Sequence, residues 1–260
     1  MKQNFTQPGN PHNLTVDQHI FPRFCIQRFT NSKGEVEYFD KTRLKSLNLN
    51  PKNHRFCGKR IWNERAENGH MKSIEDDYLK IINRVYHLIT YNLQPNDHEI
   101  IISMFLLWSF RQNRKMNPIP DQKLKGVLSN SLSLTLSVDQ KEQAEKKWVT
   151  VINNNGTVDG RDLTGDNIQL QIMHYKKQYA GMKWGILHSK NIEFIVPDTF
   201  ADIAVLPFSP HMCFVLNFES GLVTDDHVEQ INKIAISKSQ NYYFARDLSQ
   251  CFIDNSPPQD

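Results

Sequence analysis

The stretch His19-Ile-Phe-Pro-Arg-Phe-Cys-Ile-Gln-Arg-Phe29 decides how the chain begins to fold. Proline is tolerated in the first turn of a helix, where its missing N–H costs nothing, so Pro22 predicts a short helix that begins near Ile20. Gly34 then favours a turn into residues 35–39, whose valine and aromatic side chains suit a β-strand. The chain is therefore expected to open with a short helix followed by a strand.

Two longer helices are predicted next, each with a start signal and an apolar stripe. Ser73 and the aspartate three residues later are close to a capping box, and apolar residues recur at helical spacing as far as Ile89. Asn96 and the glutamate three residues later repeat this signal for a second helix, which ends before Pro118. The link between them is short, so they are expected to be antiparallel neighbours. A third helix is predicted over residues 139–149.

The chain after residue 152 has a different pattern. Asparagine, aspartate and glycine are dense between Asn153 and Asn167, which predicts a loop and an internal boundary. Apolar residues alternate with glutamines over residues 168–172, as in a half-buried strand, and Thr224 is placed to cap a final helix. Further short apolar runs, which suggest antiparallel strands, lie at residues 184–187, 192–196, 204–206 and 212–216.

These patterns predict an α+β fold with two parts. Residues 1–152 form a mainly helical part, and residues 153–260 form a small, mainly antiparallel sheet with a final helix. At 260 residues the chain is long enough to bury a sizeable core. The two parts are therefore expected to pack together as one composite domain.

Composition predicts a cytoplasmic protein without a membrane segment. Residues 1–18 lack the apolar core of a secretory signal, and the longest apolar run, residues 100–107, is far too short to span a bilayer. The cysteines show no C-x-x-C spacing, so buried, reduced thiols are expected instead of a zinc site or a disulfide framework. They are Cys25, Cys57, Cys213 and Cys251.

The opening stretch also supports a family resemblance. The spacing His-x-x-Pro-x-Phe-x-Ile-x-x-Phe over residues 19–29, followed by Tyr-Phe-Asp at residues 38–40, resembles the start of the bacterial DUF4238 proteins, a family without an established activity. The Leu-Pro-Phe-Ser-Pro segment at residues 206–210 and Asn232 in the final helix extend the resemblance over most of the chain. Just before that segment the family reads Thr-Ser-Asp-Asn-Pro, of which this chain keeps only Asp198.

A basic segment runs from Lys41 to Trp62 and contains no acidic residue. Cations in such a segment can meet phosphates while aromatic rings accept bases. The alternative is a solvated basic surface that Phe56 and Trp62 anchor to the core. The net charge of +3 is too small to indicate a nucleic-acid-binding protein, and the solvated surface is the preferred interpretation. The candidate nucleic-acid contacts are Lys52, Arg55, Lys59 and Arg60.

Four polar residues are the candidates for a catalytic site. His19 has an ordinary pKa near neutrality, so it can act as a general base or acid, and Arg23 lies one turn further on if the segment is helical. Asp40 and Asp198 stand at the ends of predicted strands, where side chains can converge on a cleft. Together with Glu75 they would supply carboxylates for a divalent metal.

Each of these candidates also has a structural interpretation. His19 can hydrogen-bond the backbone of a neighbouring strand, Asp40 can cap a turn, and Glu75 suits the first turn of a helix. The family resemblance favours a catalytic His19, because the match includes this polar residue. Metal-assisted cleavage of a phosphodiester would also need a basic partner, for which Lys59 or Arg111 is available.

One nuclease-like pattern fails on its context. Arg65-x4-His70 fits the spacing of HEPN ribonucleases, which present both side chains from one helix. Here Asn68 and Gly69 lie between them and predict a break in any helix. The pattern is therefore not expected to form that ribonuclease site.

Two functions of different classes fit these observations. The preferred one is an accessory prophage or mobile-element protein that causes phage exclusion or toxicity by binding and disabling a phage or host protein. The abundance of Asn, Lys and Ile is typical of the AT-rich genes that such elements carry. The alternative is a metal-dependent nuclease that acts on RNA or DNA, with a divalent metal as its one expected cofactor. The incomplete carboxylate set favours the first function.

Overall fold

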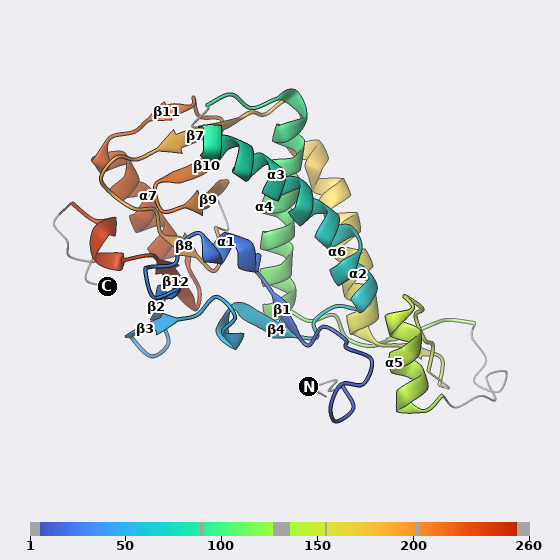
Figure 1. Ribbon diagram of the computed structural model, residues 1–260. Helices are drawn as coiled ribbons and strands as arrows, with labels where there is room; N and C mark the ends of the chain where they lie inside the picture. Colours follow the sequence, from blue (N-terminus) through green and yellow to red (C-terminus); the bar gives the residue numbers. More distant parts are fainter. Residues whose placement is uncertain (1–5, 89–90, 127–135, 154, 201–202, 254–260) are drawn as a thin grey trace.

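The computed structural model describes residues 6–88, 91–126, 136–153, 155–200 and 203–253 (Figure 1). Figure 1 shows long helices on one side of the molecule and two sheets on the other. The class is mixed α+β, as predicted. No described helix is both long and apolar enough to cross a membrane.

The helical side is built from three long helices and one short one. Helix α3 packs on α4, which in turn packs on α6, while the short helix α2 contacts α3 and α6. Gly69 separates α2 from α3, which agrees with the predicted break. These elements are α2 (Glu64–Asn68), α3 (His70–Leu88), α4 (Pro95–Met116) and α6 (Gly160–Lys176).

Helix α4 begins slightly earlier than predicted, for an identifiable reason. Pro95 occupies the first turn, and the Asp97 side chain accepts a hydrogen bond from the backbone N–H of Gln94 at 2.6 Å. This reciprocal cap sets the start of the helix two residues before the position expected for a cap at Asn96.

The first sheet joins the two ends of the sequence. Its strand order is β3-β2-β12-β8, and each neighbouring pair is antiparallel. The late strand β12 therefore lies between the early strand β2 and β8. The strands are β2 (Val36–Asp40), β3 (Lys45–Leu49), β8 (Val196–Pro197) and β12 (Tyr242–Ala245).

The second sheet has the order β11-β7-β10-β9 and is antiparallel except for the pair β11 and β7. A separate two-stranded ribbon pairs β1 (Asp17–His19) with β4 (Cys57–Lys59). The members of the second sheet are β7 (Trp184–His188), β9 (Val205–Ser209), β10 (Met212–Leu216) and β11 (Gly221–Leu222).

The remaining helices frame this body. The opening stretch forms α1 (Arg23–Gln27), with Pro22 at its N-cap, and the final helix is α7 (Asp225–Lys238), which follows Thr224 as predicted. Helix α5 (Val138–Lys146) projects at one side in Figure 1. Short elements complete the described chain: η1 (His54–Phe56), β5 (Gln122–Lys123), β6 (Thr157–Val158), η3 (Lys177–Tyr179) and η4 (Leu248–Cys251).

The predicted strand over residues 168–172 is wrong, because these residues lie within α6. Ile168 and Ile172 are four residues apart, so a helix buries both on one face, whereas Leu170 is 64% exposed on the other. Gly165 sits so close to α2 that an added Cβ would lie 2.3 Å from the Cβ of Ala66. The dense turn-forming cluster therefore includes the first turns of a closely packed helix.

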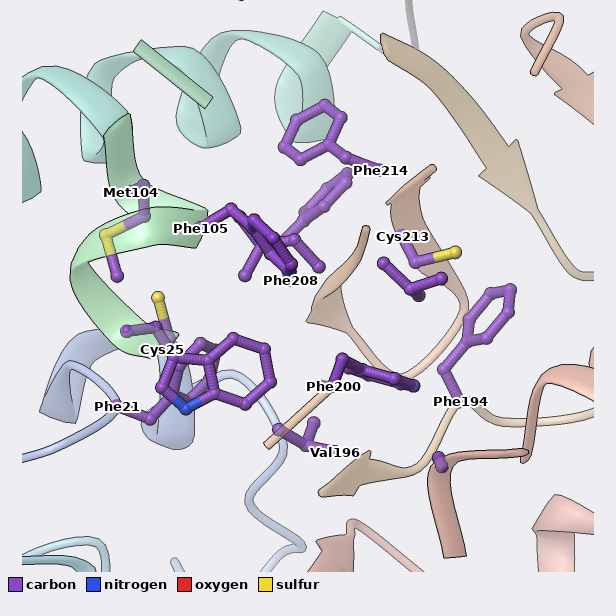
Figure 2. Packing of buried hydrophobic residues seen from close by; sticks show 14 of the residues in the cluster. Phe21, Cys25, Met104, Phe105, Phe194, Val196, Phe200, Phe208, Cys213 and Phe214 are labelled. Carbon is purple, nitrogen blue, oxygen red and sulfur yellow. The ribbon is translucent and has the colours of Figure 1, made fainter. Parts of the chain in front are cut away.

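The core continues across the predicted boundary at residue 152. Figure 2 shows side chains of the opening stretch and α4 meeting those of the strands, including Phe21, Phe105, Phe208 and Phe214. The rings of Phe208 and Phe214 are stacked with 4.4 Å between their centroids. The four cysteines are buried free thiols. The sheets are also not confined to residues 153–260, since β2 and β3 belong to the first of them.

Candidate functional site

Arg111 is the centre of a polar cluster between α3 and α4. Its side chain is 2% exposed, and its Nη1 donates a hydrogen bond to Oε1 of Glu75 on α3. The guanidinium lies over the ring of Trp62, with its carbon 5.1 Å from the ring centroid. A buried cation is thus held by one carboxylate and one aromatic face.

His19 stands at the end of β1, and burial lowers its pKa. Its Nε2 lies 2.9 Å from the carbonyl oxygen of Pro51. A carbonyl only accepts, so Nε2 carries the proton, and the neutral ring then has an unprotonated Nδ1. The nearby charges of Arg23 and Arg111 lower the pKa further, whereas Glu75 opposes them. The ring is therefore a neutral base beside two cations.

Arg23 is the exposed member of this group. It begins α1, whereas His19 belongs to β1, so the two are not on one helix face as a helical segment would have placed them. Its positive charge is nonetheless close enough to lower the pKa of His19. A substrate anion can reach Arg23 more readily than the buried Arg111.

Glu67 joins the cluster through Trp62, whose Nε1 donates to its Oε2 at 2.5 Å. Burial raises the pKa of Glu67, and the charge of Arg111 opposes that shift. Sequence analysis did not single out Glu67, which lies in the short helix α2 and has no local sequence signal for this role. We call these residues the Arg111 cluster: His19, Arg23, Glu67, Glu75 and Arg111.

Asp40 is engaged elsewhere, in the turn between β2 and β3. Its Oδ1 accepts the backbone N–H groups of Thr42 and Arg43, each at 3.1 Å. Its Oδ2 accepts from Nη1 of Arg55 at 2.7 Å. These contacts match the turn-capping interpretation and use both carboxylate oxygens.

Asp198 is likewise committed to holding the fold. Its Oδ1 accepts the N–H of Gln240 at 2.8 Å, and its Oδ2 accepts the N–H and the Nδ2 of Asn241 at 2.8 and 2.9 Å. Gln112 of α4 adds a longer bond of 3.2 Å to Oδ2. Burial raises the pKa of Asp198. The carboxylate therefore ties α4 to the start of β12.

Asn232, the other polar residue of the family resemblance, has a similar structural role. Its Nδ2 donates to the carbonyls of Glu193 and Cys251, and its Oδ1 accepts the N–H of Ile195. All three bonds are to backbone, so the side chain joins α7 to two loops.

The carboxylates do not assemble a metal site. Among the described residues, no three His, Cys, Asp or Glu side chains gather as ligands would. Asp40 and Asp198 each use their oxygens on structural donors, while Glu75 holds Arg111. The predicted divalent-metal set therefore does not fit these residues.

No family model, curated protein or solved structure matches this chain. The site is therefore interpreted from its own residues.

The basic segment lies directly beside His19. In the ribbon of β1 and β4, His19 is paired with Cys57, and Asp17 is paired with Lys59, whose Nζ lies 2.5 Å from the Asp17 carboxylate. Lys52 is exposed in the preceding loop. The segment is thus placed where it could guide a polyanion toward the cluster.

Besides Lys59, which is paired with Asp17, two more of the four predicted contacts are already in ion pairs. Arg55 binds Asp40, and Arg60 is buried with its Nη2 2.7 Å from Oε2 of Glu145. Glu145 also forms an ion pair with Arg161, with 2.5 Å between the two groups. These ion pairs attach α5 to the rest of the protein. Lys52 and Lys59 are exposed, so a phosphate can reach them more easily than the buried Arg60.

Proposed function

We propose that this chain is an accessory prophage or mobile-element protein, related to the DUF4238 proteins, that excludes phage or stops growth by cleaving RNA at the Arg111 cluster. One observation carries the proposal: the bond from Nε2 of His19 to Pro51 leaves Nδ1 unprotonated and holds the ring against the loop that bears the exposed Lys52. The charges of Arg23 and Arg111 also act on this ring. A general base in a positive field suits a reaction at a phosphate.

In the part of the chain that the structure describes, no carboxylate set for a metal assembles, which favours RNA over DNA. The 2′-hydroxyl of RNA is a nucleophile within the substrate itself, so its attack needs a base but no metal-bound water. His19 Nδ1 takes the hydroxyl proton, and the freed oxygen attacks the adjacent phosphorus. The bond from phosphorus to the 5′ oxygen breaks, and that oxygen takes a proton from a water molecule. The hydroxide that remains takes the proton from Nδ1 of His19, which restores the base. The products are a 2′,3′-cyclic phosphate and a 5′-hydroxyl end.

The other members of the cluster have separate roles in this reaction. Arg23 is exposed and would bind the phosphate oxygens, where its charge stabilises the pentavalent transition state. Arg111 is buried against Glu75, so it acts as a positioning residue that fixes the charge around His19. Lys52 and Lys59 would steer the strand, with affinity that falls as salt rises.

The test is cleavage of a labelled single-stranded RNA by the purified chain in the presence of a metal chelator. We expect the wild type to produce cyclic-phosphate ends and His19→Ala to lose activity by about 100-fold or more. His54→Ala is the matched control, because His54 is an exposed histidine on η1.

The same variants are compared by growth and phage plating. A toxic or protective effect that disappears in soluble His19→Ala, but not in His54→Ala, supports the proposal. An effect that survives in His19→Ala, with no RNA cleaved, contradicts it.

A second function, binding and disabling a phage or host protein, is favoured by exposed apolar side chains in and just after α5. Trp148 is 50% exposed and adopts a left-handed backbone conformation, with φ of 63°. Val138 at the start of α5, and Val149 and Ile152 after its end, are also exposed. Exposed aromatic and aliphatic side chains are candidates for a protein interface.

This second function makes a different prediction for the same cells. If target binding causes the effect, Trp148→Ser should abolish it while His19→Ala does not. Leu170→Ser, which changes an exposed apolar residue on α6, is the matched control.

A further inference from the structure

An open groove of about 770 Å³ lies away from the Arg111 cluster and shares no residue with it. The start of β2, the loop before β8, the β9–β10 turn and the segment after β12 all contribute to its walls. Its size is within the range of pockets that bind small ligands. The charged and titratable residues that line it are Glu37, Lys190, Glu193, His211, Arg246 and Asp247.

Glu193 is the unusual residue of this groove, since it is 2% exposed and only half of its carboxylate is used. Both Nε and Nη2 of Arg246 donate to Oε1, the former at 2.9 Å. Among the described residues, Oε2 has no hydrogen-bond partner. A buried carboxylate oxygen without a donor is costly, and native structures seldom leave one without a reason.

His211 supplies the complementary group. Its Nε2 lies 3.3 Å from Nη2 of Arg246, a group that only donates, so Nε2 accepts and the neutral ring carries its proton on Nδ1. Nδ1 is buried and also lacks a partner among the described residues. The Arg246 side chain is 40% exposed, so it can rotate toward solvent and uncover both groups.

The groove thus holds an unused anionic acceptor and an unused N–H donor, both attached to one displaceable arginine. A ligand that satisfies both must present a donor next to an acceptor oxygen, and a cationic N–H donor also matches the charge of the carboxylate. A free α-ammonium group with its adjacent carbonyl has this arrangement. Among the described residues, no Phe, Tyr or Trp lines the groove, so a stacked nucleobase is not favoured.

We propose that this groove binds the free amino end of an amino acid or peptide. The ammonium group donates to Oε2 of Glu193, and the adjacent carbonyl accepts from Nδ1 of His211. Lys190 is exposed at the rim, where it would meet the carboxylate of a free amino acid. The inference is independent of RNA cleavage, because it uses other residues.

The test is calorimetric titration of the full chain with three probes: trialanine amide, N-acetyl-trialanine amide and alanine. Acetylation removes the ammonium charge and leaves the rest of the peptide unchanged. We expect the acetylated peptide to bind at least about tenfold more weakly than the free amine, because hydrogen bonds to charged groups are the stronger kind. Alanine binding more tightly than the tripeptide would identify a free amino acid as the natural ligand, and the reverse a peptide end.

The variant Glu193→Gln should weaken the free-amine probe about tenfold as well, whereas Glu219→Gln, at an exposed glutamate outside the groove, should not. Equal affinity for the free and acetylated peptides overturns the proposal, and so does the absence of binding by both free amines. The comparison of probes uses the unaltered chain, so it decides the matter even if Glu193→Gln does not fold.

Discussion

Two neighbouring residues of α4 belong to two regions that use charge differently. Gln112 faces Asp198, whose oxygens accept backbone N–H groups from the start of β12. Arg111 faces Glu75 and influences His19, whose second ring nitrogen remains available. The first region has its carboxylate fully hydrogen-bonded, whereas the second retains a base. A polar group whose hydrogen bonds are all made stabilises the fold. A catalytic group must be fixed in place and still keep one atom available to react.

The largest expected effect would come from separating Arg111 from Glu75. Glu75→Ala leaves a buried guanidinium without its carboxylate, which should lower the free energy of unfolding by about 3–5 kcal/mol. The double variant Glu75→Ala with Arg111→Met removes both charges and should recover most of that loss. Urea unfolding measures both. A single variant as stable as the wild type would mean that the pair is hydrated and that the two regions do not differ in burial.

Asp198→Ala should be nearly as damaging, since it removes the acceptor of several buried donors. We expect a loss of about 3 kcal/mol in the free energy of unfolding. Asp226→Ala, at an exposed aspartate in the first turn of α7, is the matched control and should cost at most about 1 kcal/mol. If both variants unfold at the same urea concentration, the anchoring role of Asp198 is refuted.

Asp162 of α6 has its Oδ1 3.5 Å from Nη2 of Arg161, so it tests the ionic network that attaches α5. Burial raises its pKa from 3.8 to about 6, so the folded state binds a proton more readily than the unfolded state between these values. Stability contributed by this group is therefore present at the acid end and is lost as pH rises toward 6. The loss should be about 3 kcal/mol at most. Asp162→Asn should remove this part of the pH dependence, as followed by thermal unfolding between these pH values, and an unchanged profile would exclude the assignment.

His19→Ala should have the smallest effect on stability and the largest on cleavage. Loss of one hydrogen bond to Pro51 predicts a change of about 1 kcal/mol in the free energy of unfolding. Because burial lowers the pKa of His19, the wild type should keep cleaving RNA below pH 6.5, where an ordinary histidine becomes protonated. A pH–rate profile checks this. A His19→Ala variant that unfolds like Asp198→Ala would place His19 in the structural region instead.

Sequence patterns predicted the elements that have local signals. Pro22, the apolar stripe of α3 and the acidic first turn of α7 each indicate their helix without help from the rest of the chain. The strand predicted at residues 168–172 failed because Ile168 and Ile172, four residues apart, also share one face of a helix, which leaves Leu170 exposed on the other. Only contact with α2 through Gly165 decides for a helix.

The site was less predictable, because its members depend on long-range packing. Asp40 and Glu75 look equivalent in sequence, since each has a local structural role available. The difference lies in their partners: Asp40 binds the turn that follows it, whereas Glu75 reaches Arg111 on another helix. Glu67 joins the cluster through a hydrogen bond from Trp62, and no residue spacing in the sequence predicts that contact.

The position of β12 between β2 and β8 also bears on how the protein is made. Strand β2 is synthesised about 200 residues before β12, the strand that pairs with it in the first sheet. While the ribosome adds these residues, β2 lacks this partner. The first sheet is therefore complete only after residues 242–245 have been made. A chain that stops before residue 242 lacks this strand, and with it the anchor that Asp198 provides. Under the proposed function, α4, the helix that carries Arg111, would gain its tie to β12 only at that point.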